Sequence, residues 1–290
     1  MHAPWVLTIQ NSKILYDVRV IDINEKLSRE FSAEIRKRIL DLSHIHQTAH
    51  LGSSLSIVEI LTVLFNYQLK DFSPSKYSPT SDQFILSKGH AAVALYACLL
   101  EKGFISNADF DSYCSPGSNY EEHPNFNIPT VLCATGSLGH GLPFACGLAL
   151  SYKYTLSKQK VFVLMSDGEC NEGTVWESAQ FAYAKKLNNV IALIDHNKLQ
   201  ATGSVEETIG NLKLARMFES FGWDTYEIDG HDLDQIDQTI EKARRNANPS
   251  VIVCNTIKGK GISFMESDNN WHYRAPNESE LKLAHEELGL

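Results

Sequence analysis

Long apolar runs, paired cysteines and excess positive charge are all missing from this chain of 290 residues. No uncharged apolar run reaches the roughly 18 residues that a membrane-spanning helix requires, so we expect no span. Residues 1–25 mix Asp, Lys, Arg and Asn into the apolar positions, which argues against a secretory signal. The six cysteines include no Cys-x-x-Cys pair, and we interpret them as reduced thiols of a cytoplasmic protein.

The charge balance restricts the kinds of partner. There are 26 Lys and Arg residues against 35 Asp and Glu, which gives a net charge of −9 and argues against general binding of nucleic acid or anionic membranes. A phosphorylated ligand is still compatible with this balance, because a local site can oppose the global charge. The phosphate-binding pattern GxxxxGK[ST] does not surround Lys258 and Lys260, which leaves them as either an anion site or a solvated pair.

One stretch of the chain has the pattern strand, helix, strand. Its two apolar runs, at 161–165 and 190–194, end close to Asp167 and Asn197, and a helical pattern lies between them. Parallel strands joined by a helix leave both carboxyl ends on one edge of the sheet, where open α/β sheets bind ligands. We therefore expect Asp167 and Asn197 side by side. A carboxylate, an amide oxygen and backbone carbonyls suit Mg²⁺, and the adjoining helix start suggests a bound phosphate.

The remaining hydrophobic patterns predict an α/β domain with one parallel sheet and helices on both faces. Further strands are expected at 83–86, 223–228 and 251–255, and helices at 24–47, 91–102, 141–153, 172–187, 208–221, 233–247 and 278–288. Ser56 is predicted to cap another helix, with Glu59 as its capping-box partner. Residues 1–24 are predicted to form an amino-terminal extension, either a small hairpin or an arm on a partner, and residues 25–290 a single domain.

The polar turns of these segments resemble the amino-terminal half of transketolases. In thiamine diphosphate enzymes a Gly-Asp-Gly motif is followed, after a helix and a strand, by Asn; here Ser166 replaces the first Gly. The finer matches are Asp167-Gly168-Glu169, Asn171-Glu172-Gly173, Trp176-Glu177, Asn188-Asn189-Val190 and 195–200. The resemblance covers roughly residues 25–277.

Five further turns carry the same resemblance, with departures at three positions. They are Ala49-His50-Leu51-Gly52, Ser87-Lys88-Gly89-His90-Ala91, Glu122-His123-Pro124, Thr135-Gly136-Ser137-Leu138-Gly139-His140-Gly141, and His272 ahead of Ala275-Pro276. In the family's pattern, Gly stands at the positions of Ala49 and Glu122, and Pro at that of Leu51.

The resemblance implies the thiamine diphosphate-binding fold of the diphosphate type and a role for each matching residue. Asp167, Asn197 and the Leu199 carbonyl would bind Mg²⁺, or Ca²⁺ or Mn²⁺ in its place. The residues implied to contact the cofactor are His90, Gly136, Leu138, Gly168, Glu169, Asn197 and His272. The catalytic residues implied are His50, His123 and His272.

The resemblance further implies ketol transfer, in which a two-carbon unit passes from a ketose to an aldose, with sugars or sugar phosphates as substrates. A complete transketolase also has a pyrimidine domain, which does not occur in this sequence. We therefore expect a split enzyme, active only with a partner chain that carries this domain, in an α₂β₂ heterotetramer.

Alternative interpretations remain open at this point. The chain resembles, less closely, the α subunit of a 2-oxo acid dehydrogenase, and a diverged non-catalytic half is a further option. A Mg²⁺-dependent phosphohydrolase would need a second acidic residue, for which Asp195 is the candidate. His44, His46 and His50 have a spacing that invites a zinc site. The roles of His140 and Glu172 are undecided, and His231 and Asp232 are expected to cap or pair locally.

Overall fold

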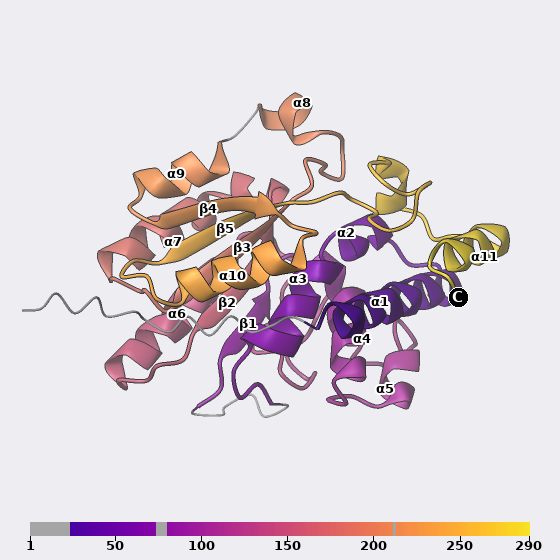
Figure 1. Ribbon diagram of the computed structural model, residues 1–290, viewed down its shortest axis with the longest axis horizontal. Helices are drawn as coiled ribbons and strands as arrows, with labels where there is room; N and C mark the ends of the chain where they lie inside the picture. The colour runs from indigo at the N-terminus through magenta and orange to yellow at the C-terminus, as the bar shows by residue number, and fades with distance from the viewer. Residues whose placement is uncertain (1–23, 74–79, 211–212) are drawn as a thin grey trace, which may run out of the picture.

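The computed structural model of the protein describes residues 24–73, 80–210 and 213–290 (Figure 1). The predicted amino-terminal extension therefore lies, except for Asn24, outside the described residues. Within the described part of the chain, no helix is both long and apolar enough to cross a membrane.

The sheet has five parallel strands in the order β1-β2-β3-β5-β4, as the α/β prediction requires. The strands are β1 (Gln83–Leu86), β2 (Val161–Ser166), β3 (Val190–His196), β4 (Asp224–Asp229) and β5 (Ser250–Asn255). Ser166, the last residue of β2, lies opposite Asp195 of β3, which runs one residue further, so the two strands end close together at the carboxyl edge.

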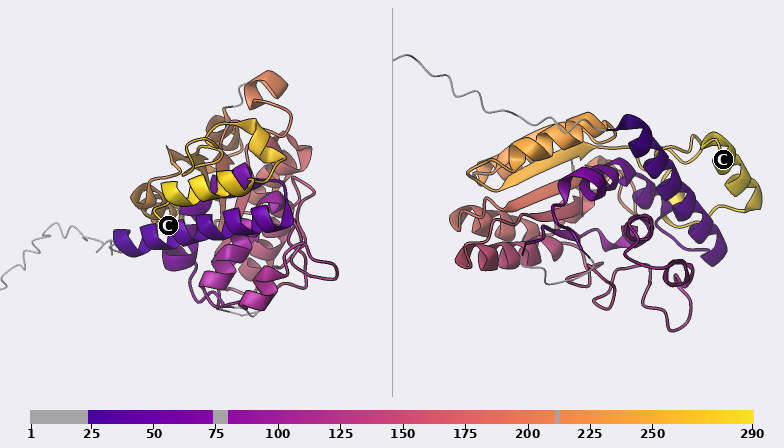
Figure 2. Two further views of the ribbon diagram at one scale, coloured as in Figure 1. Left: turned by 90° about the vertical axis from the view of Figure 1, so that its right-hand side faces the viewer. Right: turned by 60° about the horizontal axis from the view of Figure 1, so that its bottom comes forward.

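Successive side chains of the central strands face two separate cores, because a strand points alternate residues to opposite faces. Phe162 and Leu164 pack into one core, whereas Val161 and Val163 pack into the other. Helix α10 (Leu233–Ala243) covers the first face, and helices α6 (Gly141–Tyr154) and α7 (Gly173–Ala184) cover the second (Figures 1 and 2). Both faces of the sheet are therefore buried, as expected for a parallel sheet.

The helices match most of the sequence-based boundaries to within a few residues. They are α1 (Glu25–His46), α2 (Leu51–Leu55), α3 (Val58–Val63), α4 (Ala92–Glu101), α5 (Asn107–Asp111), α6 (Gly141–Tyr154), α7 (Gly173–Ala184), α8 (Val205–Ile209), α9 (Leu214–Ser220), α10 (Leu233–Ala243) and α11 (Glu278–Glu287). Short 3₁₀ segments occupy 89–91, 168–171 and 269–272, and a π-helical turn occupies 64–68.

Two local predictions were wrong. Ser56 does not cap a helix with Glu59, because its hydroxyl lies 2.7 Å from Asp195, to which it donates, and 3.0 Å from the Ser53 carbonyl, while Glu59 pairs with Arg36. The single helix expected at 208–221 is two helices, α8 and α9, and Gly210 with a φ of 89° ends the first of them. A positive φ does not fit a right-handed helix, which accounts for the break.

Candidate functional site

The predicted site residues converge on one cavity of about 280 Å³ beside the carboxyl ends of β2 and β3. In Figure 1 the strands run toward α2, which supplies one wall of this cavity. Every predicted site residue except Glu169 lines it: His50, His90, His123, Gly136, Leu138, Asp167, Gly168, Asn197, Leu199 and His272. Sequence segments more than 200 residues apart thus contribute to a single concave site.

Asp167 is a buried carboxyl whose hydrogen bonds within the described chain come from the backbone. Its two oxygens accept from the N–H groups of Gly168 (2.7 Å) and Lys198 (2.6 Å). Burial, followed by the charge of Asp195, raises the pKa of Asp167 to about 7. An adjacent metal ion stabilises the charged form of a buried carboxyl group, so Asp167 is suited to be a ligand of a cation.

Asn197 is oriented so that its amide oxygen is available beside Asp167. Its Nδ2 donates to Asp195 (2.8 Å), which identifies the other terminal atom as oxygen. That oxygen accepts one hydrogen bond, from the N–H of Leu199 (3.1 Å), and has a second lone pair left for a ligand. The donor set of Asp167, Asn197 and the Leu199 carbonyl therefore consists of hard oxygens that suit a divalent cation such as Mg²⁺.

Asp195 and Lys88 form a fully buried ion pair behind this edge, and both side chains have 0% exposure. Lys88 also donates to the Ser53 carbonyl at 2.9 Å, and Asp195 accepts from the hydroxyls of Ser56 and Thr256. Although burial raises it, the pKa of Asp195 is lowered overall by the charge and hydrogen bond of Lys88. Because these groups occupy its oxygens, Asp195 does not supply the second acidic ligand that a phosphohydrolase would need.

Four histidines also line the cavity, in addition to the oxygen donors that suit a metal ion. The ring centroid of His50 lies 5.4 Å from His90, 5.8 Å from His123 and 5.0 Å from His272. Burial lowers the pKa of His50 and His90, and burial together with Lys258 lowers that of His272 to about 3. His50, His90 and His272 are therefore neutral at pH 7 and can each donate and accept a hydrogen bond.

Two residues that line the cavity each have a buried polar atom without a partner in the described part of the chain, which fits a site for a polar ligand. Among the residues that the structure describes, Nδ1 of His50 and Nε2 of Gln200 are buried without a hydrogen-bond partner. A buried polar atom without a partner is costly, and a bound molecule would satisfy both. Gln200 belonged to the matched motif but was not predicted as a site residue.

Glycine at two positions lets backbone and side chains approach the cavity closely. A Cβ on Gly136, whose φ is 130°, would lie 2.5 Å from Cδ2 of His123, and one on Gly168 would lie 3.1 Å from Cγ of Gln200. Any larger residue at these two positions would intrude on the space beside the turns that carry Gly136 and Gly168.

Two glutamates have roles that the motifs did not reveal. Glu169 does not line the cavity: its buried carboxylate accepts from the Gly139 N–H (2.8 Å) and the Ser87 hydroxyl, which ties together the turns that form the cavity floor. Glu122, which replaces a family Gly, accepts from the Ala49 N–H at 2.9 Å. Glu122 thereby joins the two loops that carry His50 and His123, and His123 still reaches the cavity.

The residues left undecided lie outside the cavity. His140 is exposed, with Nδ1 close to the Ser137 and Leu138 carbonyls, and Glu172 is exposed at the start of α7. The zinc site considered for His44, His46 and His50 does not form. His44 Nδ1 lies 2.8 Å from the Pro276 carbonyl, and the described residues contain no group of three or more His, Cys, Asp or Glu side chains that could bind a metal ion.

Comparisons with known proteins agree with this geometry. Residues 27–290 match the family described as transketolase, thiamine diphosphate binding domain. The chain is 38% identical over 265 residues to one subunit of the apulose-4-phosphate transketolase of Actinobacillus succinogenes, covering 91% of this chain and 96% of that protein. It is 37% identical over 257 residues to the 6-deoxy-6-sulfo-D-fructose transketolase subunit SqwG of Clostridium sp., covering 88% and 93%.

Among solved structures, transketolase from Campylobacter jejuni matches with a TM-score of 0.87 and 29% sequence identity. The match covers 92% of this chain but only 43% of the Campylobacter chain. The chain thus spans nearly the whole length of the two related subunits, and less than half of this longer transketolase.

Proposed function

This chain belongs to the transketolase family as its thiamine diphosphate-binding domain, and from this membership we propose that it is the diphosphate-binding subunit of a two-chain transketolase. The observation that carries the proposal is the convergence of the family-matched residues on one cavity. The similar length of relatives named as subunits supports the two-chain arrangement. On this proposal residues 25–290 are one functional domain, and a partner chain supplies the pyrimidine domain in an α₂β₂ heterotetramer.

Asp167, Asn197 and the Leu199 carbonyl are proposed to bind Mg²⁺, or Ca²⁺ or Mn²⁺ in its place. The Gly168 N–H and the neutral rings of His90 and His272 would then hold the diphosphate by hydrogen bonds. The backbone at Gly136 and Leu138 would lie along the cofactor. When bound, thiamine diphosphate supplies the electron sink needed to break and form a carbon–carbon bond beside a carbonyl.

His50, His123 and His272 are proposed to surround the reacting carbon and the oxygens of the substrate, where His50 and His123 would exchange protons with it and His272 would donate a hydrogen bond. A neutral imidazole can accept a proton from a sugar hydroxyl and return it later at a pH near 7. Nδ1 of His50 has no partner within the described part of the protein, so it is free to take this part. Glu122 assists by holding the His50 and His123 loops in one arrangement.

The proposed substrates are a ketose donor and an aldose acceptor. The names of the two related subunits describe sugars with a phosphate or a sulfo group, and we propose that the donor of this enzyme also has an anionic group. The six free cysteines fit a reducing compartment, and we propose a cytoplasmic location.

Assay of ketol transfer tests the proposal directly. The purified chain, alone and mixed with a candidate pyrimidine-domain chain, is incubated with thiamine diphosphate, Mg²⁺ and a panel of ketose phosphates and sulfonates with aldose acceptors. We expect turnover only from the mixture. Robust turnover by the chain alone would contradict the two-chain proposal, and decarboxylation of pyruvate instead of ketol transfer would favour the 2-oxo acid dehydrogenase alternative.

Replacing Gly136 with Ala is expected to weaken binding of thiamine diphosphate about tenfold, or about 1.4 kcal/mol, because the added Cβ displaces His123 and the turn that would lie along the cofactor. Calorimetric titration of the cofactor measures the change. Gly117→Ala is the matched control, since Gly117 also has a positive φ of 81° but an added Cβ meets nothing within 4 Å. Equal affinities of the two variants would contradict the proposed closeness of Gly136 to the cofactor.

A further inference from the structure

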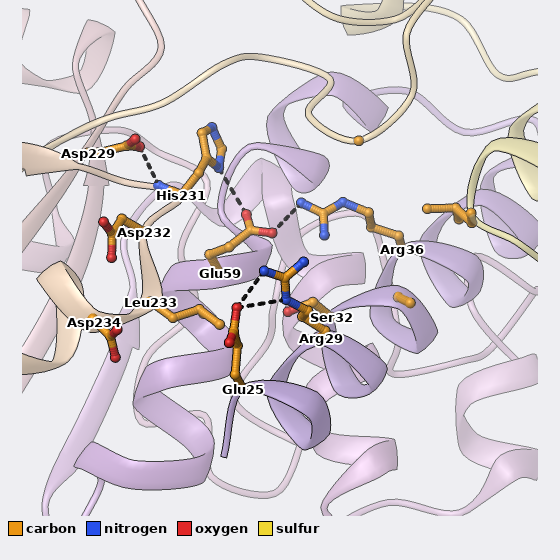
Figure 3. Close-up of a pocket in the computed structure, with 13 residues that line it drawn as sticks. Glu25, Arg29, Ser32, Arg36, Glu59, Asp229, His231, Asp232, Leu233 and Asp234 are labelled. Atoms are coloured by element: carbon orange, nitrogen blue, oxygen red, sulfur yellow. Dashed lines mark hydrogen bonds and ion pairs between the residues drawn. The ribbon is translucent and has the colours of Figure 1, made fainter. Parts of the chain in front are cut away.

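A second cavity, of about 650 Å³, lies between α1, α3, the start of α10 and the loop after β4 (Figure 3). It shares no lining residue with the cavity of about 280 Å³ in which the cofactor is proposed to bind, called the cofactor cavity below. Figure 3 shows the carboxylate of Glu59 held between His231 and the guanidinium of Arg36. The three side chains come from the loop after β4, from α3 and from α1, so tertiary packing brings them together.

The three side chains form a continuous and largely buried chain of hydrogen bonds. Arg36 Nη2 donates to Oε1 of Glu59 at 2.6 Å, and Nδ1 of His231 lies 2.9 Å from Oε2. His231 Nε2 accepts the N–H of Ile257 at 2.8 Å, so the ring proton must be on Nδ1, which donates to Glu59. Both oxygens of Glu59 are therefore used, one by each neighbour.

The outer ends of this chain bond the backbone of one short segment. His231 accepts from the N–H of Ile257, and Nε of Arg36 donates to the carbonyl of Lys260 at 3.0 Å. Gly261 follows with a φ of 96°, and a Cβ there would lie 2.5 Å from Nε of Arg36. Glu59 thus links two contacts that hold segment 257–260 at both of its ends.

Lys258 lies between the two held positions and contacts the cofactor cavity. Its side chain is almost fully buried, and Nζ donates to Oδ1 of Asn269 at 2.7 Å and lies 3.1 Å from Nδ1 of His272. Nζ also donates to the carbonyl of Gln200 at 3.5 Å, so its neighbours include two oxygen acceptors, and the pKa of Lys258, which burial lowers to about 8, still favours the ammonium at pH 7. An ammonium only donates, so Nδ1 of His272 accepts, and the proton of the neutral ring is on Nε2.

We propose that Glu59 is a positioning residue that, through Arg36 and His231, holds Lys258 against His272 and so sets the tautomer that His272 presents to the cofactor cavity. The catalytic consequence rests on the proposed function. The tautomer itself is a property of the free chain and can be measured without cofactor, partner or turnover.

The test compares Glu59→Gln with the matched control Glu25→Gln. Glu25 lines the same cavity and pairs with Arg29 (Figure 3), but both of these side chains are mostly exposed. Each variant of the full chain loses one negative charge. The measurements are ¹⁵N chemical shifts of histidine-labelled protein, with His272 assigned by its loss in His272→Ala, and hydrogen exchange of the Ile257 amide.

In the unmodified chain and in Glu25→Gln, we expect His272 to be the Nε2–H tautomer at pH 7. In Glu59→Gln we expect a mixture of both tautomers, and exchange at the Ile257 amide faster by on the order of tenfold, because its acceptor His231 is released. In the reconstituted enzyme the same variant is expected to lower kcat more than it changes KM, since His272 is still present but part of it is the wrong tautomer.

A folded Glu59→Gln chain with the Nε2–H tautomer intact and Ile257 protected as before would overturn the proposal. If Glu59→Gln does not fold, His231→Gln is measured by the same criteria, since it changes a loop residue at the edge of the same chain of bonds. Lack of cofactor binding by any form would count against the proposed function alone, because the tautomer result stands independently of it.

Discussion

Replacing Asp167 with Asn is expected to remove Mg²⁺-dependent binding of thiamine diphosphate, weakening the Kd by at least about 100-fold. Asp167 is the only charged member of the proposed ligand set, and even residues that merely support metal ligands change metal affinity by roughly 10–100-fold. Burial and the neighbouring charge of Asp195 raise the pKa of this carboxyl to about 7, and a bound cation would offset both effects. Calorimetric titration with thiamine diphosphate, with and without Mg²⁺, measures the change in the reconstituted complex.

Asp234→Asn is the control for this loss, because it makes the same chemical change at an exposed residue in the first turn of α10. We expect the control to bind cofactor as the unmodified chain does. If Asp167→Asn retained the full Mg²⁺ dependence of binding, the proposed metal site would be wrong, and the cation would have to be bound by other groups of the cavity.

Replacing Lys88 with Met is expected to destabilise the fold by about 3–5 kcal/mol, because it leaves the Asp195 carboxylate buried and unpaired. Neither side chain of this pair has any exposed surface, so water cannot replace the lost ammonium. Equilibrium unfolding in urea at pH 7 measures the loss. Cofactor affinity is expected to fall as well, since Asp195 orients the amide of Asn197.

Lys26→Met provides the matched comparison, because it removes the same charge from the Lys26–Glu30 pair on the surface of α1. The side chains of that pair are 84% and 60% exposed, and such pairs contribute about 0–1 kcal/mol. A loss in Lys88→Met no larger than in Lys26→Met would mean that Asp195 finds another partner or takes up a proton in the variant.

The strand ends were predictable from the sequence because they are marked locally. The apolar runs of β2 and β3 stop at polar residues, and parallel strands must end on one edge of the sheet. Asp167 and Asn197 therefore had to be neighbours once the strands were identified. The same reasoning does not extend to 208–221, where Gly210 interrupts an otherwise helical pattern.

The contacts behind the site were not predictable in this way. Asp195 was weighed only as a possible acidic ligand, because nothing within β3 reveals that Lys88 reaches it from the turn after β1. Glu59 was expected to cap a helix with Ser56, since the local spacing fits a capping box. In the structure it bonds Arg36 and His231 instead, from two other elements.

By itself, the sequence determined the class of fold, the edge of the sheet that carries the site and the residues of nearly all its turns, because strand periodicity, turn glycines and short motifs are encoded over a few neighbouring residues. Only the tertiary structure decided which distant side chains satisfy one another: Lys88 with Asp195, Glu122 with the His50 loop, and Glu59 with the segment that carries Lys258. The physical reason is that a buried charge must find its partner in space, and packing brings that partner from any point of the chain.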